Sequence, residues 1–132
     1  MRVFLDTNVL VSAFATRGIC ADVLRIGVAE HDLMLGETVL GELRRVLRDK
    51  LGVPCATVDS TERFLREQGA VVARGRPLGL ELCDPDDVAV LEQAVTGEAD
   101  VLVTGDRDLL EVAGQVLIAI TTPRGFWESL RV

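Results

Sequence analysis

The sequence predicts an α/β fold in which five parallel strands form a central sheet with helices on both faces. Five short apolar runs, bounded by polar or turn residues, are typical of strands that are buried on both faces. Segments with helical spacing or helix caps separate these runs, and this alternation favours a parallel sheet. The expected strands are residues 3–5, 33–35, 70–73, 101–103 and 116–120.

The segment 37–51 has the clearest helical pattern, because Val39, Leu40 and Leu43 follow the 3-and-4 spacing of one face. At about 100° per residue, Glu42 falls on the border of this apolar stripe, where it would line the rim of a pocket. Taken alone, this helix favours an ordinary solvated glutamate over a functional one. The other expected helices are residues 8–15, 20–30, 58–68 and 88–95, a short one at 109–110, and one that begins after Thr122.

Length and composition indicate one globular domain. The chain has 132 residues, of which 48% are hydrophobic and 27% charged, values that suit a single buried core. The irregular residues 74–83 are too short to link two domains, so we expect residues 1–132 to form a single domain. No apolar run approaches a membrane span, and Arg2 and Asp6 argue against a signal peptide. We therefore expect a cytoplasmic protein without membrane association.

The cysteines and the single histidine limit the chemistry further. Cys20, Cys55 and Cys83 lack the spacing of a metal or redox site, so we expect small buried residues in a reducing compartment. His31 lies in a turn between a helix and a strand, which argues against acid–base catalysis by histidine.

The net charge is −7, from 21 acidic and 14 basic residues. This balance argues against a protein that grips nucleic acid through a broad basic face. The excess of acids matters less if several of them gather in one metal-binding pocket, because a bound divalent cation reverses the local sign.

Two aspartates follow apolar strands. Asp6 comes directly after residues 3–5, and Thr7 and Asn8 then offer residues that start a helix. In open α/β sheets, ligands bind at this end of the strands, so helix cap and active site are equally supported for Asp6 alone. Asp106 repeats the arrangement after the strand 101–103. Two independent caps are a poor explanation for this repetition.

Asp87 lies at the start of the helix that contains residues 88–95. Val90, Leu91 and Ala94 define the apolar face of this helix, and Asp87 projects close to its middle. An ionised carboxylate aimed at the protein is costly unless it meets a cation or several donors. Asp84, which precedes a proline, instead matches an N-cap. The pattern favours a functional role for Asp87 over capping alone.

The predicted topology brings Asp6, Asp87 and Asp106 together, with Glu42 at the rim. Four carboxylates in one pocket repel one another unless divalent cations neutralise them. Ligands that are all oxygen favour hard ions such as Mg²⁺ or Mn²⁺, which also recruit phosphates. The matching chemistry is hydrolysis of a phosphodiester by metal-activated water.

At this point a family resemblance is visible over nearly the whole chain. The sequence resembles a PIN domain, close to the bacterial branch of VapC-like toxins from toxin–antitoxin pairs. The order and spacing of several short motifs carry the resemblance. They are residues 3–8 (VFLDTN), Glu42, residues 84–87 (DPDD) with Ala94, residues 103–110 (VTGDRDLL) and residues 122–126 (TPRGF).

The resemblance implies a three-layer α/β/α sandwich and an endoribonuclease that depends on Mg²⁺ or Mn²⁺. It also implies a set of site residues. Asp86 competes with Asp87 for one place in this set, and the angular position and the spacing to Ala94 favour Asp87. The matching metal-binding acids are Asp6, Glu42, Asp87 and Asp106, with Asp108 as a common fifth acid and Asn8 and Thr104 as supporting polar residues.

The resemblance also implies partners. Family members often form homodimers, and a small antitoxin protein holds toxin members inactive by blocking the site. Arg44, Arg45 and Arg48 lie near Glu42 and could contact phosphates of the RNA substrate. A solvated helix face explains these three arginines equally well.

Several other functions deserve comparison. Within the same family, the chain could be an RNA-processing nuclease without an antitoxin, or a non-catalytic domain that binds RNA or a partner. The full set of acids argues against the second, because a pure binder has no use for charges that repel phosphate.

Two other protein classes share parts of the pattern. A phosphatase of the haloacid dehalogenase type needs a second aspartate where Asn8 stands and a catalytic lysine, but Lys50 lies well down a helix. A receiver domain needs a lysine after its last strand, and residues 116–132 contain none. Both classes are therefore weaker explanations than a nuclease.

Overall fold

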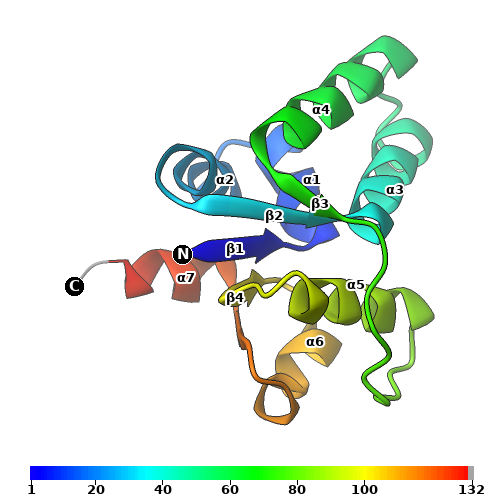
Figure 1. The fold of residues 1–132 in the computed structure, drawn as a ribbon. Helices are drawn as coiled ribbons and strands as arrows, with labels where there is room; N and C mark the ends of the chain where they lie inside the picture. Colours follow the sequence, from blue (N-terminus) through cyan, green and yellow to red (C-terminus); the bar gives the residue numbers. More distant parts are fainter. Residues whose placement is uncertain (131–132) are drawn as a thin grey trace.

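The sheet has the strand order β3-β2-β1-β4-β5, and all five strands are parallel (Figure 1). The computed structural model describes residues 1–130. In it, β1 lies at the centre, with Val3 opposite Leu33 on one side and opposite Val101 on the other. The strands are β1 (Arg2–Leu5), β2 (Asp32–Gly36), β3 (Ala70–Val72), β4 (Val101–Val103) and β5 (Ala119–Thr121).

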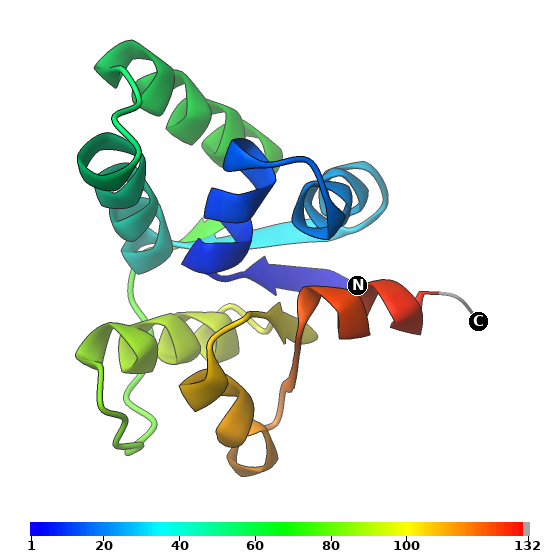
Figure 2. The ribbon, with the colours of Figure 1, turned by 180° about the vertical axis from the view of Figure 1, so that it is seen from behind.

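Helices cover both faces of the sheet, which confirms the predicted α/β/α architecture. The chain runs from β1 outward to β3 and then returns to β4 and β5, so right-handed crossovers place α1–α4 and α5–α6 on opposite sides (Figures 1 and 2). The helices are α1 (Thr7–Ala15), α2 (Ile19–Glu30), α3 (Glu37–Arg45), α4 (Cys55–Gln68), α5 (Pro85–Thr96), α6 (Arg107–Glu111) and α7 (Pro123–Ser129).

The chain adds strands on one side of β1 up to β3 and then adds β4 and β5 on the other side, and this change at β1 and β4 determines where a ligand can bind. At such a switch point the connections from neighbouring strands leave toward opposite faces, which opens a crevice at the carboxyl ends of the strands. Val3, Phe4 and Leu5 of β1 are completely buried, as are Leu102 and Val103 of β4. Their continuous apolar runs follow from the helical cover on both faces.

The helix predicted at residues 37–51 is only partly α-helical. The expected continuous helix 37–51 is α-helical only to Arg45, and Val46–Lys50 forms a π-helix, η1. The bond from Leu51 N to Val46 O, 3.1 Å long, spans five residues instead of four. The 3-and-4 apolar spacing does not distinguish the two helix types over so few residues.

Several strands and helices begin at other residues than the sequence predicts. β5 begins at Ala119 instead of residue 116, because its partner β4 offers only three residues for pairing. Leu117 is fully exposed. α4 begins at Cys55, directly after Pro54.

The expectation that all cysteines are buried was wrong. Cys55 and Cys83 are exposed, and Cys20 is half-buried. None of the helices within residues 1–130 has the length and apolar character needed to cross a membrane.

A buried side chain joins the two helical layers at the carboxyl end of β2. Gln93 of α5 is only 4% exposed, and its Nε2 donates to Thr38 Oγ1 of α3 at 2.9 Å. This close approach depends on Gly36, because a Cβ at that position would clash with Gln93 Oε1 and lie 3.0 Å from the ring of Phe4. Both neighbours are buried, and Phe4 is completely so.

We expect Gly36→Ala to lower the free energy of unfolding by about 1–3 kcal/mol, the usual cost of overpacking a core. Gly41→Ala is the matched control, since Gly41 lies on α3 with no atom within 4 Å of an added Cβ. That change should raise the free energy of unfolding by about 0.5–1 kcal/mol through helix propensity. Urea denaturation measures both. Equal stability of the two variants would contradict this description of the interlayer contact.

Candidate metal centre

Asp6 is fixed at the carboxyl end of β1 and is 5% exposed. Its Oδ1 accepts a hydrogen bond from the backbone N–H of Thr7 at 2.8 Å, which caps α1. Its Oδ2 accepts from Thr104 Oγ1 at 2.6 Å, and its backbone N donates to Val103 O at 3.0 Å. Asp6 is therefore both a helix cap and a residue anchored to the neighbouring strand.

The turn after β4 completes this connection. The hydroxyl of Thr104, which is fully buried, also accepts from the backbone N–H of Asp106 at 2.9 Å. Asp106 Oδ1 in turn accepts from the backbone N–H of Asp108 at 2.8 Å and caps α6. Gly105 N donates to Asn8 Oδ1 at 3.2 Å. Asn8 and Thr104, expected as supporting polar residues, thus hold the ends of β1 and β4 together.

Four of the five expected acids, Asp6, Glu42, Asp87 and Asp106, line one pocket of about 330 Å³ at this switch point, whereas Asp108 does not line it. We call it the acidic pocket. Carboxylates reach it from the residue after β1, from α3, from the N-cap and first turn of α5 and from the turn before α6, so four separate segments contribute. Its lining residues are Asp6, Thr7, Asn8, Val11, Ser12, Glu42, Val46, Asp84, Asp87 and Asp106.

Three of the aspartates approach one another closely. One carboxylate oxygen each from Asp87, Asp106 and Asp108 lies within 4.8 Å of the other two, close enough for a shared metal ion. Asp86, the competitor of Asp87, does not line the acidic pocket, and its carboxylate lies 3.9 Å from the guanidinium of Arg45.

Burial and mutual repulsion raise the pKa of three acids of the pocket, Asp6, Glu42 and Asp87. Burial, and next the charges of Asp106 and Asp84, raise the pKa of Asp87 to about 7. Burial also raises the pKa of Asp6, although the hydrogen bonds from Thr104 and Thr7 oppose the shift. The pKa of Glu42 is raised as well, again mainly by burial. A cation would relieve the repulsion that these shifts reflect.

The residues of the acidic pocket fit a hard divalent cation. Its potential donors are carboxylate oxygens, without histidine or cysteine, as Mg²⁺ and Mn²⁺ prefer. The hydroxyl of Thr7 is buried near the carboxylate of Glu42 but makes no hydrogen bond of good geometry within the described residues. Such an atom is costly unless a further polar group occupies the pocket, and the hydration shell of a cation supplies one.

Sequence reasoning missed three polar residues of the acidic pocket, Thr7, Ser12 and Asp84. Ser12 follows Asn8 by four positions on α1, so helical spacing places the two on one face and could have indicated it. Asp84 was interpreted only as an N-cap. Its Oδ1 does accept from the backbone N–H of Asp86 at 2.9 Å, but its side chain also lines the pocket.

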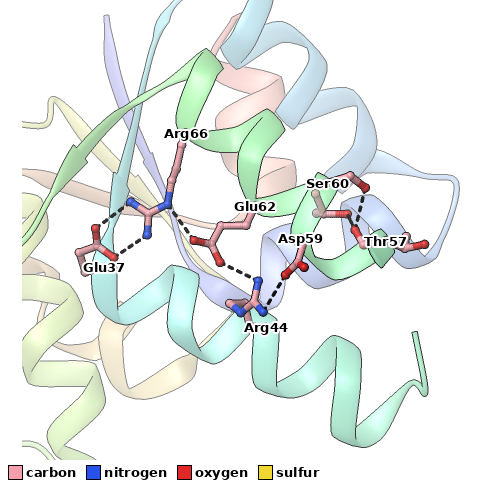
Figure 3. A network of polar contacts seen from close by, with 8 residues as sticks. Glu37, Arg44, Thr57, Asp59, Ser60, Glu62 and Arg66 are labelled. Atoms are coloured by element: carbon pink, nitrogen blue, oxygen red, sulfur yellow. Dashed lines mark hydrogen bonds and ion pairs between the residues drawn. The ribbon is translucent and has the colours of Figure 1, made fainter. Parts of the chain in front are cut away.

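The three arginines near Glu42 have different surroundings. Arg44 lies 2.9 Å from Asp59 and 3.0 Å from Glu62 (Figure 3), which ties α3 to α4. Arg48 pairs with the adjacent Asp49 at 2.8 Å. Arg45, in contrast, lies beside Glu42 in a second pocket.

Figure 3 shows that the network around Arg44 continues along α4. Glu62 also accepts from Arg66 at 2.8 Å, and Arg66 forms two further bonds of 2.8 Å to Glu37 at the start of α3. Arg44 is therefore part of a structural connection between two helices.

Comparison with known families identifies the chain. A PIN domain family model matches residues 2–108, a stretch that contains all the acids of the pocket. The chain belongs to the PIN domain family. Members of this family are in general nucleases, so the acidic pocket lies where nuclease chemistry is expected.

Two solved structures share the PIN fold of this chain. One is VapBC2 from Rickettsia felis, solved in complex with a DNA fragment from its promoter. It has a TM-score of 0.66 and 14% sequence identity, and the match covers 92% of this chain and 98% of that chain. A domain of a functionally unknown protein from Methanocaldococcus jannaschii DSM 2661 has a TM-score of 0.57 at 18% identity, covering 90% and 88%. No protein of curated function matches the chain.

The raised pKa of Asp87 predicts how the stability of the metal-free protein depends on pH. Because folding raises this pKa from 3.8 to about 7, the folded state binds the proton more tightly than the unfolded state. The resulting stability is present in full below about pH 4 and is lost as the pH rises through about 7. In EDTA, the Tm of the wild-type protein should therefore fall as the pH rises from about 4 to above 7. The Tm of Asp87→Asn should fall less over the same pH range.

Saturating Mg²⁺ should restore the Tm of the wild-type protein at pH 8, since the ion then balances the ionised carboxylates. Melting curves between pH 4.5 and pH 8 measure these effects. A wild-type Tm with the same pH dependence as that of Asp87→Asn would contradict the prediction.

Proposed function

We propose that the protein is a Mg²⁺- or Mn²⁺-dependent endoribonuclease that hydrolyses RNA phosphodiester bonds with metal-activated water. The observation that carries the proposal is the acidic pocket at the switch point between β1 and β4, where Asp6, Glu42, Asp87 and Asp106 meet. Such a cluster needs a cation, and a hard cation recruits phosphate.

In this proposal Asp6, Glu42, Asp87, Asp106 and Asp108 hold the ion. The bound ion supplies a lower pKa for water and stabilises negative charge on the leaving oxygen. The chain itself supplies the preorganisation, since the carboxylates of Asp6 and Asp106 each accept a hydrogen bond from a backbone N–H, that of Thr7 and that of Asp108.

Two side chains have more specific roles. Thr104 Oγ1 holds the Asp6 carboxylate in one orientation, because it donates to Asp6 while it accepts from Asp106 N. Glu42 would hold the ion from α3, and the raised pKa of its carboxyl group in the ion-free protein is one of the shifts that a bound ion would reverse. Glu42 comes from α3, so it approaches the substrate from a different side than the strand-end aspartates do.

We further propose that the protein is the toxin of a toxin–antitoxin pair, a single cytoplasmic domain that forms a homodimer and is inhibited by a small antitoxin. The fold shared with VapBC2 and the motifs of the sequence support this proposal. A small open reading frame directly upstream of the gene would distinguish it from an RNA-processing nuclease without an antitoxin.

Purified protein should cleave RNA with Mg²⁺ or Mn²⁺ and not with EDTA. Asp106→Asn should lower the rate at least about 100-fold, because it removes one charge from the site. Asparagine can still accept from the backbone N–H of Asp108, so the cap of α6 and the fold should persist. Gel analysis of a panel of structured RNAs, with single-stranded DNA for comparison, measures the activity.

Asp22→Asn is the matched control for the change of charge. Asp22 lies on α2 and pairs with Arg25 at 2.8 Å, and it does not line the acidic pocket. Its cleavage rate should equal that of the wild type. Equal cleavage by all three proteins, or cleavage in EDTA, would overturn the assigned site.

A further inference from the structure

A second pocket of about 230 Å³ adjoins the acidic pocket. We call it the flanking pocket. The two pockets share Glu42 and Val46, so they meet across these two side chains. A chain molecule bound in one pocket can therefore continue into the other. The flanking pocket is lined by Glu42, Arg45, Val46, Asp49 and Lys50.

The π-helix explains why two cations face this pocket. In an α-helix, Arg45 and Lys50 would point about 140° apart, because they are five residues apart. The π-helix Val46–Lys50 has bonds that span five residues, which brings residues at this spacing onto one side. Arg45 and Lys50 accordingly line the same pocket.

The side chains of Arg45 and Lys50 are both free to bind a further anion within the described part of the chain. Lys50 forms no ion pair with any of the described residues 1–130. The contact of Arg45 with Asp86 is 3.9 Å long, and both side chains are about half exposed, so this pair is weak. Asp49 opposes the two cations less than its charge suggests, because it accepts from Arg48 at 2.8 and 3.3 Å.

We propose that Arg45 and Lys50 form a phosphate subsite, which holds a backbone phosphate of RNA adjacent to the bond that is cut. The inference rests on the proposed function. It gives the RNA strand a path over the surface, from the acidic pocket across Glu42 and Val46 toward η1. In a protein with a net charge of −7, Arg45 and Lys50 place two positive side chains beside the acidic pocket, where they can contact the RNA backbone. Arg45 and Lys50 bind substrate without taking part in the chemistry.

The test compares Lys50→Gln and Arg45→Gln with Arg63→Gln. All three residues are exposed, so the folds should persist, and Arg63 lies on α4 and lines neither of the two pockets. With a single-stranded RNA that the wild type cleaves, the first two variants should raise KM at least threefold and change kcat less than twofold. Arg63→Gln should match the wild type. Lys50→Arg should restore KM.

Binding provides a readout that is independent of cleavage. Fluorescence anisotropy with a fluorescein-labelled 12-nucleotide RNA, in Mg²⁺ and the Asp106→Asn background, should show a higher Kd for Lys50→Gln. The slope of log K against log salt should fall by about one. Arg63→Gln in the same background should leave both unchanged.

The outcomes separate the two proposals. Cleavage with KM and salt slope unchanged in Lys50→Gln and Arg45→Gln would overturn the subsite and leave the nuclease standing. Weaker RNA binding by these variants without any cleavage by the wild type would overturn the nuclease, and with it the place of the subsite beside a bond that is cut. A wild-type protein that binds no RNA at all would contradict the subsite.

Discussion

The hydrogen bond from Thr104 to Asp6 joins the carboxyl ends of β1 and β4, and the acidic pocket depends on it. Buried strands with continuous apolar runs place both residues at one edge of the sheet. The bond is 2.6 Å long and its donor is fully buried, so it fixes one carboxylate at the switch point. Asp106 is then positioned through the same hydroxyl. A short buried connection thus organises acids from two distant parts of the sequence.

This arrangement has an electrostatic cost that the chain does not relieve by itself. Burial and neighbouring charges raise the pKa of Asp6, Glu42 and Asp87, and the nearby arginines serve other partners: Arg44 bridges to α4, and Arg48 pairs with Asp49. Arg45 lies in the flanking pocket beside Glu42, and its contact with Asp86 is 3.9 Å long. A divalent cation is the simplest group that balances such a cluster.

Local patterns were sufficient to predict the five strands, apart from the start of β5, because strands buried on both faces leave continuous apolar runs in the sequence. The same patterns could not reveal η1, since a single π-turn leaves no distinct period in five residues. They also could not reveal the partners of Arg44, which come from another helix and depend on tertiary packing. Asp84 shows a third limit, because a residue that caps a helix can line a pocket as well.

Anomalous scattering from crystals soaked in Mn²⁺ tests the central claim most directly, namely that the acidic pocket is a divalent metal site. The account predicts an anomalous peak among the carboxylates of Asp87, Asp106 and Asp108, whose oxygens already lie within 4.8 Å of one another. The peak should disappear in Asp87→Asn and persist in Asp22→Asn. The absence of a peak in this pocket at millimolar Mn²⁺, or a peak that remains in Asp87→Asn, would contradict the account.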